Sequence, residues 1–234
     1  MKYLVCITLL LFGCSKSQIS PVPNVPDAAK KVYFIGDSIT YGYGASDSSK
    51  RWTSLYCASK GYTEINKGVI GEVLEDSTNC AFHYVFDKTA IPLKKSDGKA
   101  LFISLGTNDI GDNNGKMSPE GYKTALSNLV DYAINQMGWP KTSIVIAGPY
   151  LITNKSYFLS RAAGCTVSAW DDARLQAYVN AALTVASAKG CISADIYRAM
   201  AGYSVPAHLL SNDGIHPNDA GHQFIATFMR KLTL

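Results

Sequence analysis

Four short polar stretches of this chain contain the residue types that acyl transfer requires. Ser38 lies in the string FIGDSITYG, directly after an apolar run, and Asp213 and His216 lie three residues apart in DGIHP near the C-terminus. A serine hydroxyl is a weak nucleophile near neutral pH, so it needs an adjacent base that a third group orients. His216 can take the proton of Ser38, and Asp213 can fold back onto the imidazole. These residues predict a nucleophile, a base and an orienting acid.

The other two stretches contain donors for the oxyanion of a tetrahedral intermediate. Gly71 lies in NKGVIG and Asn108 in GTND. The backbone N–H groups of Ser38 and Gly71 and the side-chain amide of Asn108 can stabilise such an oxyanion together. Gly68, in the same string, is the alternative to Gly71. Taken singly, each stretch is also ordinary turn or helix-capping chemistry, so it is their combination that indicates catalysis.

The elements that precede these stretches must bring them together. Unbroken apolar runs at 32–35, 100–105 and 144–147 predict strands covered on both faces, with shorter candidate strands at 63–69 and 192–197. Apolar residues at helical spacing predict helices from Ser118-Pro119 to Met137, from Ser168 to Gly190, and over 224–232. This alternation predicts a parallel sheet between two helical layers, with ligands outside the carboxyl ends of the strands.

The ordered set GDSIT, Gly71, GTND and DGIHP resembles the SGNH hydrolases, also called the GDSL esterase/lipase family, over about residues 32–232. The resemblance implies a flavodoxin-like three-layer α/β/α sandwich with a central parallel sheet of about five strands. It also implies that Ser38 is the nucleophile, that Ser38, Gly71 and Asn108 form the oxyanion hole, and that His216 and Asp213 complete the triad. Ile39 replaces the leucine of the usual signature, and both are apolar. We expect no cofactor and no metal.

The first residues resemble a processing signal. Lys2 precedes an apolar run at 3–12 that is too short to span a bilayer as a helix. The string LFGC resembles the lipobox of bacterial lipoproteins, which implies cleavage before Cys14 and lipidation of its thiol; a plain secretory signal is the alternative. We therefore expect a signal peptide at 1–13, a lipidated Cys and flexible tether at 14–29, and one hydrolase domain at 30–234. The protein would be an exported lipoprotein, periplasmic or at the cell surface, anchored to a membrane.

Composition adds two expectations. The chain has 234 residues and a net charge of +4 without runs of basic residues, which indicates one domain and no nucleic-acid partner. Cys57, Cys80, Cys165 and Cys191 are even in number in an exported chain, so two disulfides are expected. The sequence-local pairing, Cys57 with Cys80 and Cys165 with Cys191, is one of three connectivities. Nothing in the sequence indicates an oligomeric state.

The expected function is that of a serine esterase that removes short acyl groups, above all acetyl, from carbohydrates. The segments 41–50 (YGYGASDSSK) and 110–117 (IGDNNGKM) are polar, and Tyr41, Tyr43 or Trp52 can offer a ring face to a sugar. Alternatives are a lysophospholipase or acyl-thioesterase acting on lipids, and a non-catalytic glycan-binding lipoprotein. Of the other histidines, His83 and His222 fall in helical patterns as packing or surface residues, and His208 lacks a well-spaced acidic partner.

Overall fold

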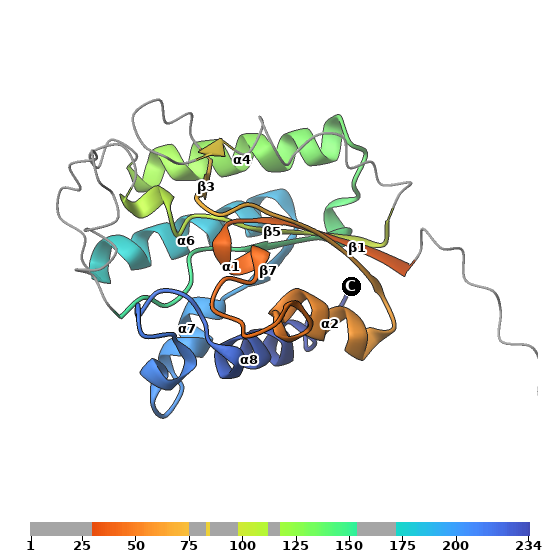
Figure 1. Ribbon diagram of the computed structural model, residues 1–234. Coiled ribbons are helices and arrows are strands. Elements are labelled where there is room, and N and C mark those ends of the chain that lie inside the picture. Colours follow the sequence, from red (N-terminus) through yellow and green to blue (C-terminus); the bar gives the residue numbers. More distant parts are fainter. Residues whose placement is uncertain (1–29, 75–82, 85–97, 112–117, 154–171) are drawn as a thin grey trace, which may run out of the picture.

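A parallel sheet forms the middle layer of the molecule (Figure 1). The computed structural model describes residues 30–74, 83–84, 98–111, 118–153 and 172–234. Within these ranges the sheet has five strands in the order β2-β1-β5-β6-β7, and every neighbouring pair is parallel. The strands are β1 (Lys31–Gly36), β2 (Thr63–Gly68), β5 (Ala100–Ser104), β6 (Ile144–Ala147) and β7 (Ile192–Ala194). A separate pair consists of β3 (Glu72–Val73) and β4 (His83–Tyr84).

Helices cover both faces of the sheet (Figure 1). One layer contains α4 (Pro119–Asn135) and α6 (Asp172–Lys189), and the other contains α2 (Trp52–Lys60), α7 (Ile196–Ala201) and α8 (Asp219–Met229). The four-residue α1 (Ser38–Tyr41) follows β1. Short 3₁₀ segments complete the described elements: η2 (Ser48–Lys50), η4 (Asp109–Gly111), η6 (Lys141–Ser143) and η7 (Pro206–Leu209). This arrangement confirms the predicted three-layer α/β/α fold.

Two apolar cores lie on either side of the sheet because successive strand residues point to opposite faces. Ile35 and Ile103 pack in the core under α4 and α6. Phe34 and Phe102 stack at 5.0 Å between ring centroids in the core under α2 and α8. Alternation with apolar residues on both sides explains why the central strands are unbroken apolar runs in the sequence.

Some predicted boundaries are wrong. The last strand stops at Ala194 instead of 197 because the Asp195 carboxylate accepts a hydrogen bond from Arg198 N (3.1 Å) and begins α7. The last helix begins earlier than predicted, at Asp219, where the Asn218 side chain accepts from Gly221 N (3.1 Å). His83 lies in β4 and not in a helix. The predicted helix start at Ser168 lies outside the described residues.

The disulfide prediction is contradicted where the structure tests it. Cys57 and Cys191 are free cysteines, and their predicted partners Cys80 and Cys165 lie outside the described residues. Cys57 points from α2 into the core beside Trp52, and burial raises the pKa of its thiol to about 12. Burial also raises the pKa of Cys191, to about 11. A buried thiol of this kind packs as a small apolar side chain.

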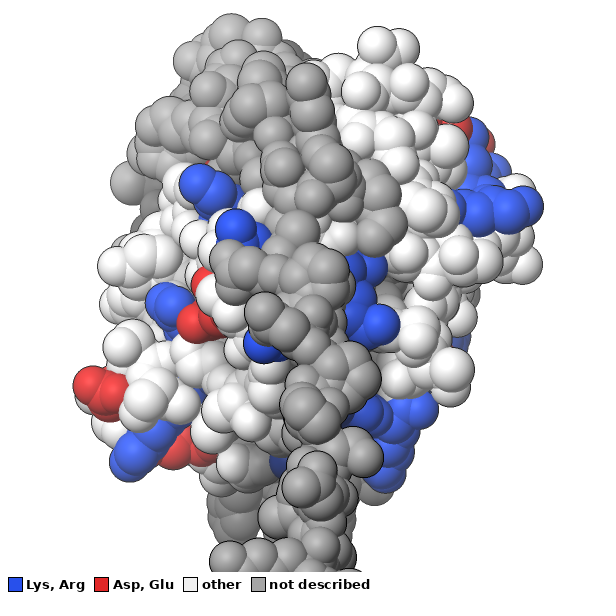
Figure 2. Space-filling view, turned by 90° about the vertical axis from the view of Figure 1, so that its right-hand side faces the viewer, with Lys and Arg blue, Asp and Glu red and all other residues white. Residues whose placement is uncertain are grey.

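The two ends of the strands define two edges of the sheet. The carboxyl edge is where β1, β5 and β6 end, and the amino edge is where they begin. The exposed Lys60, Lys141 and Lys231 all lie beside element ends at the amino edge. Figure 2 looks onto this side of the molecule and shows Lys and Arg spread over its visible part. None of the helices in the described ranges is both long and apolar enough to cross a membrane.

Candidate active site

Ser38 lies at a sharp corner between β1 and α1, on the carboxyl edge. Gly36 permits the corner, because a Cβ there would lie 2.1 Å from Thr40 Oγ1 and 2.6 Å from Ser104 O. The Asp37 side chain caps α1 by accepting from Ile39 N (2.9 Å), and Gly42 ends the helix with a left-handed φ of 105°. Ser38 is therefore the first residue of α1, where backbone N–H groups have no partner within the helix.

A continuous hydrogen-bond chain joins the three residues predicted as a triad. Ser38 Oγ lies 2.9 Å from His216 Nε2, and His216 Nδ1 lies 2.6 Å from Asp213 Oδ2. Ser38 and His216 are 4% and 7% exposed, so their interaction is largely shielded from water. The fold thus brings residue 38 against residue 216 although they are far apart in the sequence.

The DGIHP loop orients the imidazole through its own backbone. Asp213 Oδ1 accepts from Ile215 N (2.9 Å) and from His216 N (3.0 Å), which leaves Oδ2 for the imidazole. Burial raises the pKa of Asp213, but the hydrogen bonds from His216 and Ile215 outweigh it, so this pKa lies below its ordinary value. An ionised Asp213 requires the proton of the neutral imidazole to be on Nδ1. Nε2 is then free to accept the proton of Ser38.

The structure distinguishes Gly71 from Gly68, the two glycines predicted as alternatives for the oxyanion hole. Gly71 has a φ of +79° at the third position of a turn that is closed by a hydrogen bond from Glu72 N to Val69 O (3.1 Å), and this position needs glycine. The N–H of Gly68 already donates to Asn66 Oδ1 (2.8 Å). A Cβ on Gly68 would also lie 2.3 Å from Tyr41 N, so Gly68 is needed for close packing against α1.

Asn108 lies beside Gly71. Its Nδ2 donates to the backbone oxygen of Glu72 (3.0 Å), which identifies the amide nitrogen and leaves its second N–H for another acceptor. The neighbouring Asp109 accepts from Leu74 N (2.8 Å), so two consecutive residues of the loop after β5 bind the segment that contains Gly71. This arrangement places the Asn108 amide and the Gly71 turn on the same edge as Ser38.

Asp37 is a buried carboxyl group next to Ser38. It is 0% exposed, and burial raises its pKa to about 6 against the lowering effect of the bond from Ile39 N. Its Oδ2 lies near the Thr107 hydroxyl, but among the described residues neither atom has a well-formed hydrogen bond. The corner that carries Ser38 therefore contains a carboxyl group that burial favours in its neutral form.

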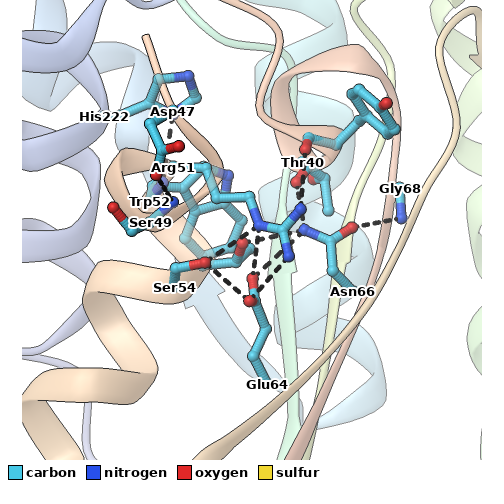
Figure 3. Close-up of polar contacts among 12 residues, drawn as sticks. Thr40, Asp47, Ser49, Arg51, Trp52, Ser54, Glu64, Asn66, Gly68 and His222 are labelled. Carbon is cyan, nitrogen blue, oxygen red and sulfur yellow. Dashed lines mark hydrogen bonds and ion pairs between the residues drawn. The ribbon is translucent and has the colours of Figure 1, made fainter. Parts of the chain in front are cut away.

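A polar network supports α1 from the side of β2 (Figure 3). Asn66 Nδ2 donates to Thr40 O (2.6 Å), and Arg51 forms two parallel hydrogen bonds of 2.9 Å with the Glu64 carboxylate. Ser54 Oγ donates to the same carboxylate (2.7 Å). Burial raises the pKa of Glu64, but these bonds outweigh it and lower the pKa. The network connects α1, α2 and β2, so it stabilises the position of α1 and of Ser38 at its start.

Some residues contact the site only because the fold brings distant segments together, and the sequence did not predict them. The backbone oxygen of Glu72 and the imidazole of His222, which lies 3.3 Å from Tyr43 O, carry no sequence signal for these contacts. Trp52, expected to face a sugar, is instead 0% exposed and packs against Phe34 at 5.2 Å between centroids. Within the described ranges, no three His, Cys, Asp or Glu side chains gather as a metal-binding group.

The polar stretches that meet at this edge also match a known family. The model of the GDSL-like lipase/acylhydrolase family matches residues 34–224, which is most of the chain. The chain belongs to this family. A multidomain esterase from Ruminococcus flavefaciens is 23% identical over 252 residues, which cover 89% of this chain and 30% of that protein. The chain thus spans less than a third of the length of this multidomain relative.

Solved structures with the same fold agree with the family. The lipase/acylhydrolase from Enterococcus faecalis has a TM-score of 0.63 at 20% identity, over 86% of this chain and 94% of that one. A carbohydrate acetylesterase family member from Sinorhizobium meliloti has a TM-score of 0.60 at 19% identity, over 86% of this chain and 95% of that one. The aryl esterase of M. smegmatis has a TM-score of 0.62 at 17% identity, over 87% of this chain and 97% of that one. At these identities the similarity shows the shared GDSL-like fold.

Proposed function

We propose that this GDSL-like protein is a serine esterase that hydrolyses short-chain acyl esters, mainly acetyl esters of carbohydrates. The observation that carries the proposal is the hydrogen-bond chain from the buried Ser38 through the buried His216 to the half-buried Asp213, with the Asn108 amide on the same edge. A non-catalytic glycan-binding protein has no need of all these groups in one arrangement.

In the proposed mechanism, Ser38 Oγ attacks the ester carbonyl carbon while its proton moves to His216 Nε2, 2.9 Å away. The ionised Asp213 stabilises the resulting imidazolium through Nδ1. The carbonyl oxygen becomes an oxyanion, which accepts from the N–H groups of Ser38 and Gly71 and from Asn108 Nδ2. His216 then gives its proton to the leaving alcohol oxygen. Water repeats these steps on the acyl-enzyme, releases the acid and restores Ser38.

The preference for a short acyl group and a sugar rests on the segment that follows α1. Residues 41–50 are half-buried or exposed and mostly polar, and Tyr41 and Tyr43 are 51% and 40% exposed. A long acyl chain needs a continuous apolar lining, at about 0.8 kcal/mol for each buried CH₂. The names of two structural relatives, a carbohydrate acetylesterase family member and an aryl esterase, are consistent with this preference.

A series of 4-nitrophenyl esters from acetyl to dodecanoyl tests the acyl preference. We expect kcat/KM to be highest at acetyl or butyryl and to fall steeply by octanoyl. Values that rise through octanoyl would replace this proposal with the lipid-directed alternative. Mass spectrometry after a rapid acid quench provides the mechanistic test, because an acetyl group must be found on Ser38. If neither turnover nor an acetyl-enzyme can be detected, the esterase proposal fails as a whole.

Anchoring through a lipidated Cys14 is part of this proposal. The chain that precedes Lys30 joins the molecule at the amino edge, where β1 begins, so an anchor there would direct Ser38 away from a membrane. The exposed lysines of that edge suit an anionic lipid surface. Mass spectrometry of the N-terminal peptide from the membrane fraction tests it: we expect residue 14 to be first and diacylglycerol-modified. An unmodified peptide that begins after residue 14 would indicate a plain secretory signal.

A further inference from the structure

Tyr43 contacts the imidazole that the proposed mechanism uses as its base. The ring centroids of Tyr43 and His216 are 4.4 Å apart, with 52° between the ring planes. His216 is 7% exposed, whereas Tyr43 is 40% exposed. One part of the Tyr43 ring therefore packs on the imidazole, and another part faces the solvent directly beside it.

The backbone N–H and C=O of Tyr43 are bound to α1 and to α8. Tyr43 N donates to Ser38 O (2.9 Å), and the buried His222 donates from Nε2 to Tyr43 O (3.3 Å). His222 Nδ1 accepts from Trp52 N (3.3 Å), so the proton of the neutral ring is on Nε2, and burial lowers the pKa of His222 to about 4. His222 is therefore neutral at physiological pH and keeps this bond.

The residues after Tyr43 are bound just as closely. Gly44 has a φ of +92°, and a Cβ there would lie 2.2 Å from Pro217 O and 3.2 Å from His216 Cβ. The Asp219 carboxylate accepts from Ser46 N (2.8 Å) and Ser46 Oγ (2.7 Å). An aromatic ring on a backbone attached at several points is preorganised, so a ligand that packs on it does not have to order it first.

The direction of proton transfer determines which half of a substrate reaches this ring. The acyl carbon bonds to Ser38 Oγ, and its carbonyl oxygen turns toward the donors at Gly71 and Asn108. The leaving alcohol oxygen must lie within hydrogen-bond distance of His216 Nε2 to receive its proton. The group attached to that oxygen therefore lies beside His216, where the exposed part of the Tyr43 ring is.

From this juxtaposition we infer that Tyr43 determines specificity for the alcohol half of the ester. This inference rests on the proposed function and adds to it. The C–H face of a sugar would pack on the Tyr43 ring, and other parts of the site would contact the acyl half of the ester. An amphipathic ring that is half exposed and rigid is suited to such contacts. Tyr62, which is half-buried just before β2 at the amino edge and packs on the Tyr56 ring at 6.3 Å between centroids, provides a matched control far from His216.

The test compares two acetate esters that form the same acetyl-enzyme from different alcohols, ethyl acetate and methyl 6-O-acetylglucoside. In the full chain, Tyr43→Leu should lower kcat/KM for the sugar ester about tenfold to thirtyfold, the loss of an aromatic contact in a packed site. The value for ethyl acetate should change less than threefold, and hydrolysis of the acetyl-enzyme should not change. Tyr43→Phe should behave like the wild type, and the control Tyr62→Leu should leave both esters within about twofold.

Other outcomes overturn the inference in distinct ways. An equal fall for both esters with Tyr43→Leu would mean that Tyr43 only positions His216, and no change for either would mean that the alcohol does not contact it. A loss with Tyr43→Phe would mean that the hydroxyl matters, and not the ring. Detection of the acetyl-enzyme on Ser38 keeps these results separate from the proposed function, because any of them can occur in an enzyme that is acetylated normally.

Discussion

The two edges of the sheet differ in whether their polar groups are buried or exposed. At the carboxyl edge, Asp37, Ser38, Asn108 and His216 are each less than 10% exposed, and hydrogen bonds satisfy most of their polar atoms. At the amino edge, the lysines are on the surface, where water solvates them (Figure 2). Burial of polar groups is unfavourable unless they are paired, so the carboxyl edge depends on its hydrogen bonds in a way that the amino edge does not. The two edges should therefore respond very differently to substitution.

Loss of Ser38 or His216, the proposed nucleophile and base, should have the largest effect. Ser38→Ala or His216→Ala should lower kcat by roughly 10⁴-fold to 10⁶-fold, and the double variant should be little worse, because the two residues act as a unit. Turnover of 4-nitrophenyl acetate and labelling by a fluorophosphonate measure this. Thermal unfolding should show an intact fold in each variant. Labelling at another serine, or near-normal turnover by Ser38→Ala, would contradict the expectation that substitutions at the carboxyl edge have the largest effect.

Loss of Asn108, the proposed side-chain oxyanion donor, should have the next largest effect. Asn108→Ala should lower kcat about a hundredfold to a thousandfold, with little change in KM, because the donor acts on charge that develops in the transition state. The exposed Asn128 on α4 offers a control, and Asn128→Ala should change kcat less than twofold. A rise in KM alone would make Asn108 a ground-state contact.

The sequence identified the residues that meet at the carboxyl edge better than the residues that pack around them. Ser38, Asn108 and His216 follow strands or precede a helix in short polar strings, so their types and their positions were both visible. The contact of Tyr43 with His216 depends on how two distant loops pack, which spacing along the chain does not encode. Cys57 was mispredicted for a related reason: an even number of cysteines does not reveal that one of them faces the core.

The buried carboxyl of Asp37 gives a prediction about stability and pH. Burial raises the pKa of Asp37 in the folded protein to about 6, above the ordinary 3.8, because the neutral carboxyl group is easier to bury than the charged one. The contribution of the neutral Asp37 to the free energy of unfolding is therefore complete below pH 3.8 and is lost as pH rises through 6. Asparagine caps a helix as well as aspartate does and has no charge. Asp37→Asn should therefore raise the free energy of unfolding by up to about 3 kcal/mol at pH 8, and by almost nothing at pH 3.5.

Urea unfolding at both pH values measures this effect. Asp47 is the matched control, since its side chain caps η2 through Ser49 N (2.8 Å) but is exposed. Bonds from the Ser49 side chain and backbone lower the pKa of Asp47, so Asp47→Asn should have the opposite sign: a small loss of stability at pH 8. A destabilised Asp37→Asn at pH 8 would show that the charged carboxylate is needed in the corner.

The smallest effect is expected at the amino edge. Lys60, at the end of α2, and Lys231, just after α8, are exposed, and among the described residues neither takes part in a salt bridge. Surface substitutions of this kind change stability by less than about 0.5 kcal/mol. Both lysines also lie the full length of the strands away from Ser38, and over such a distance salt in the solvent screens their charge from the reaction.

The double variant Lys60→Gln with Lys231→Gln should therefore keep kcat/KM for 4-nitrophenyl acetate within about twofold. Solvated charges at this distance change the electrostatic potential at Ser38 only slightly. A fall of more than fivefold, with unchanged urea unfolding, would mean that the amino edge influences the chemistry and that the functional difference between the edges is one of degree.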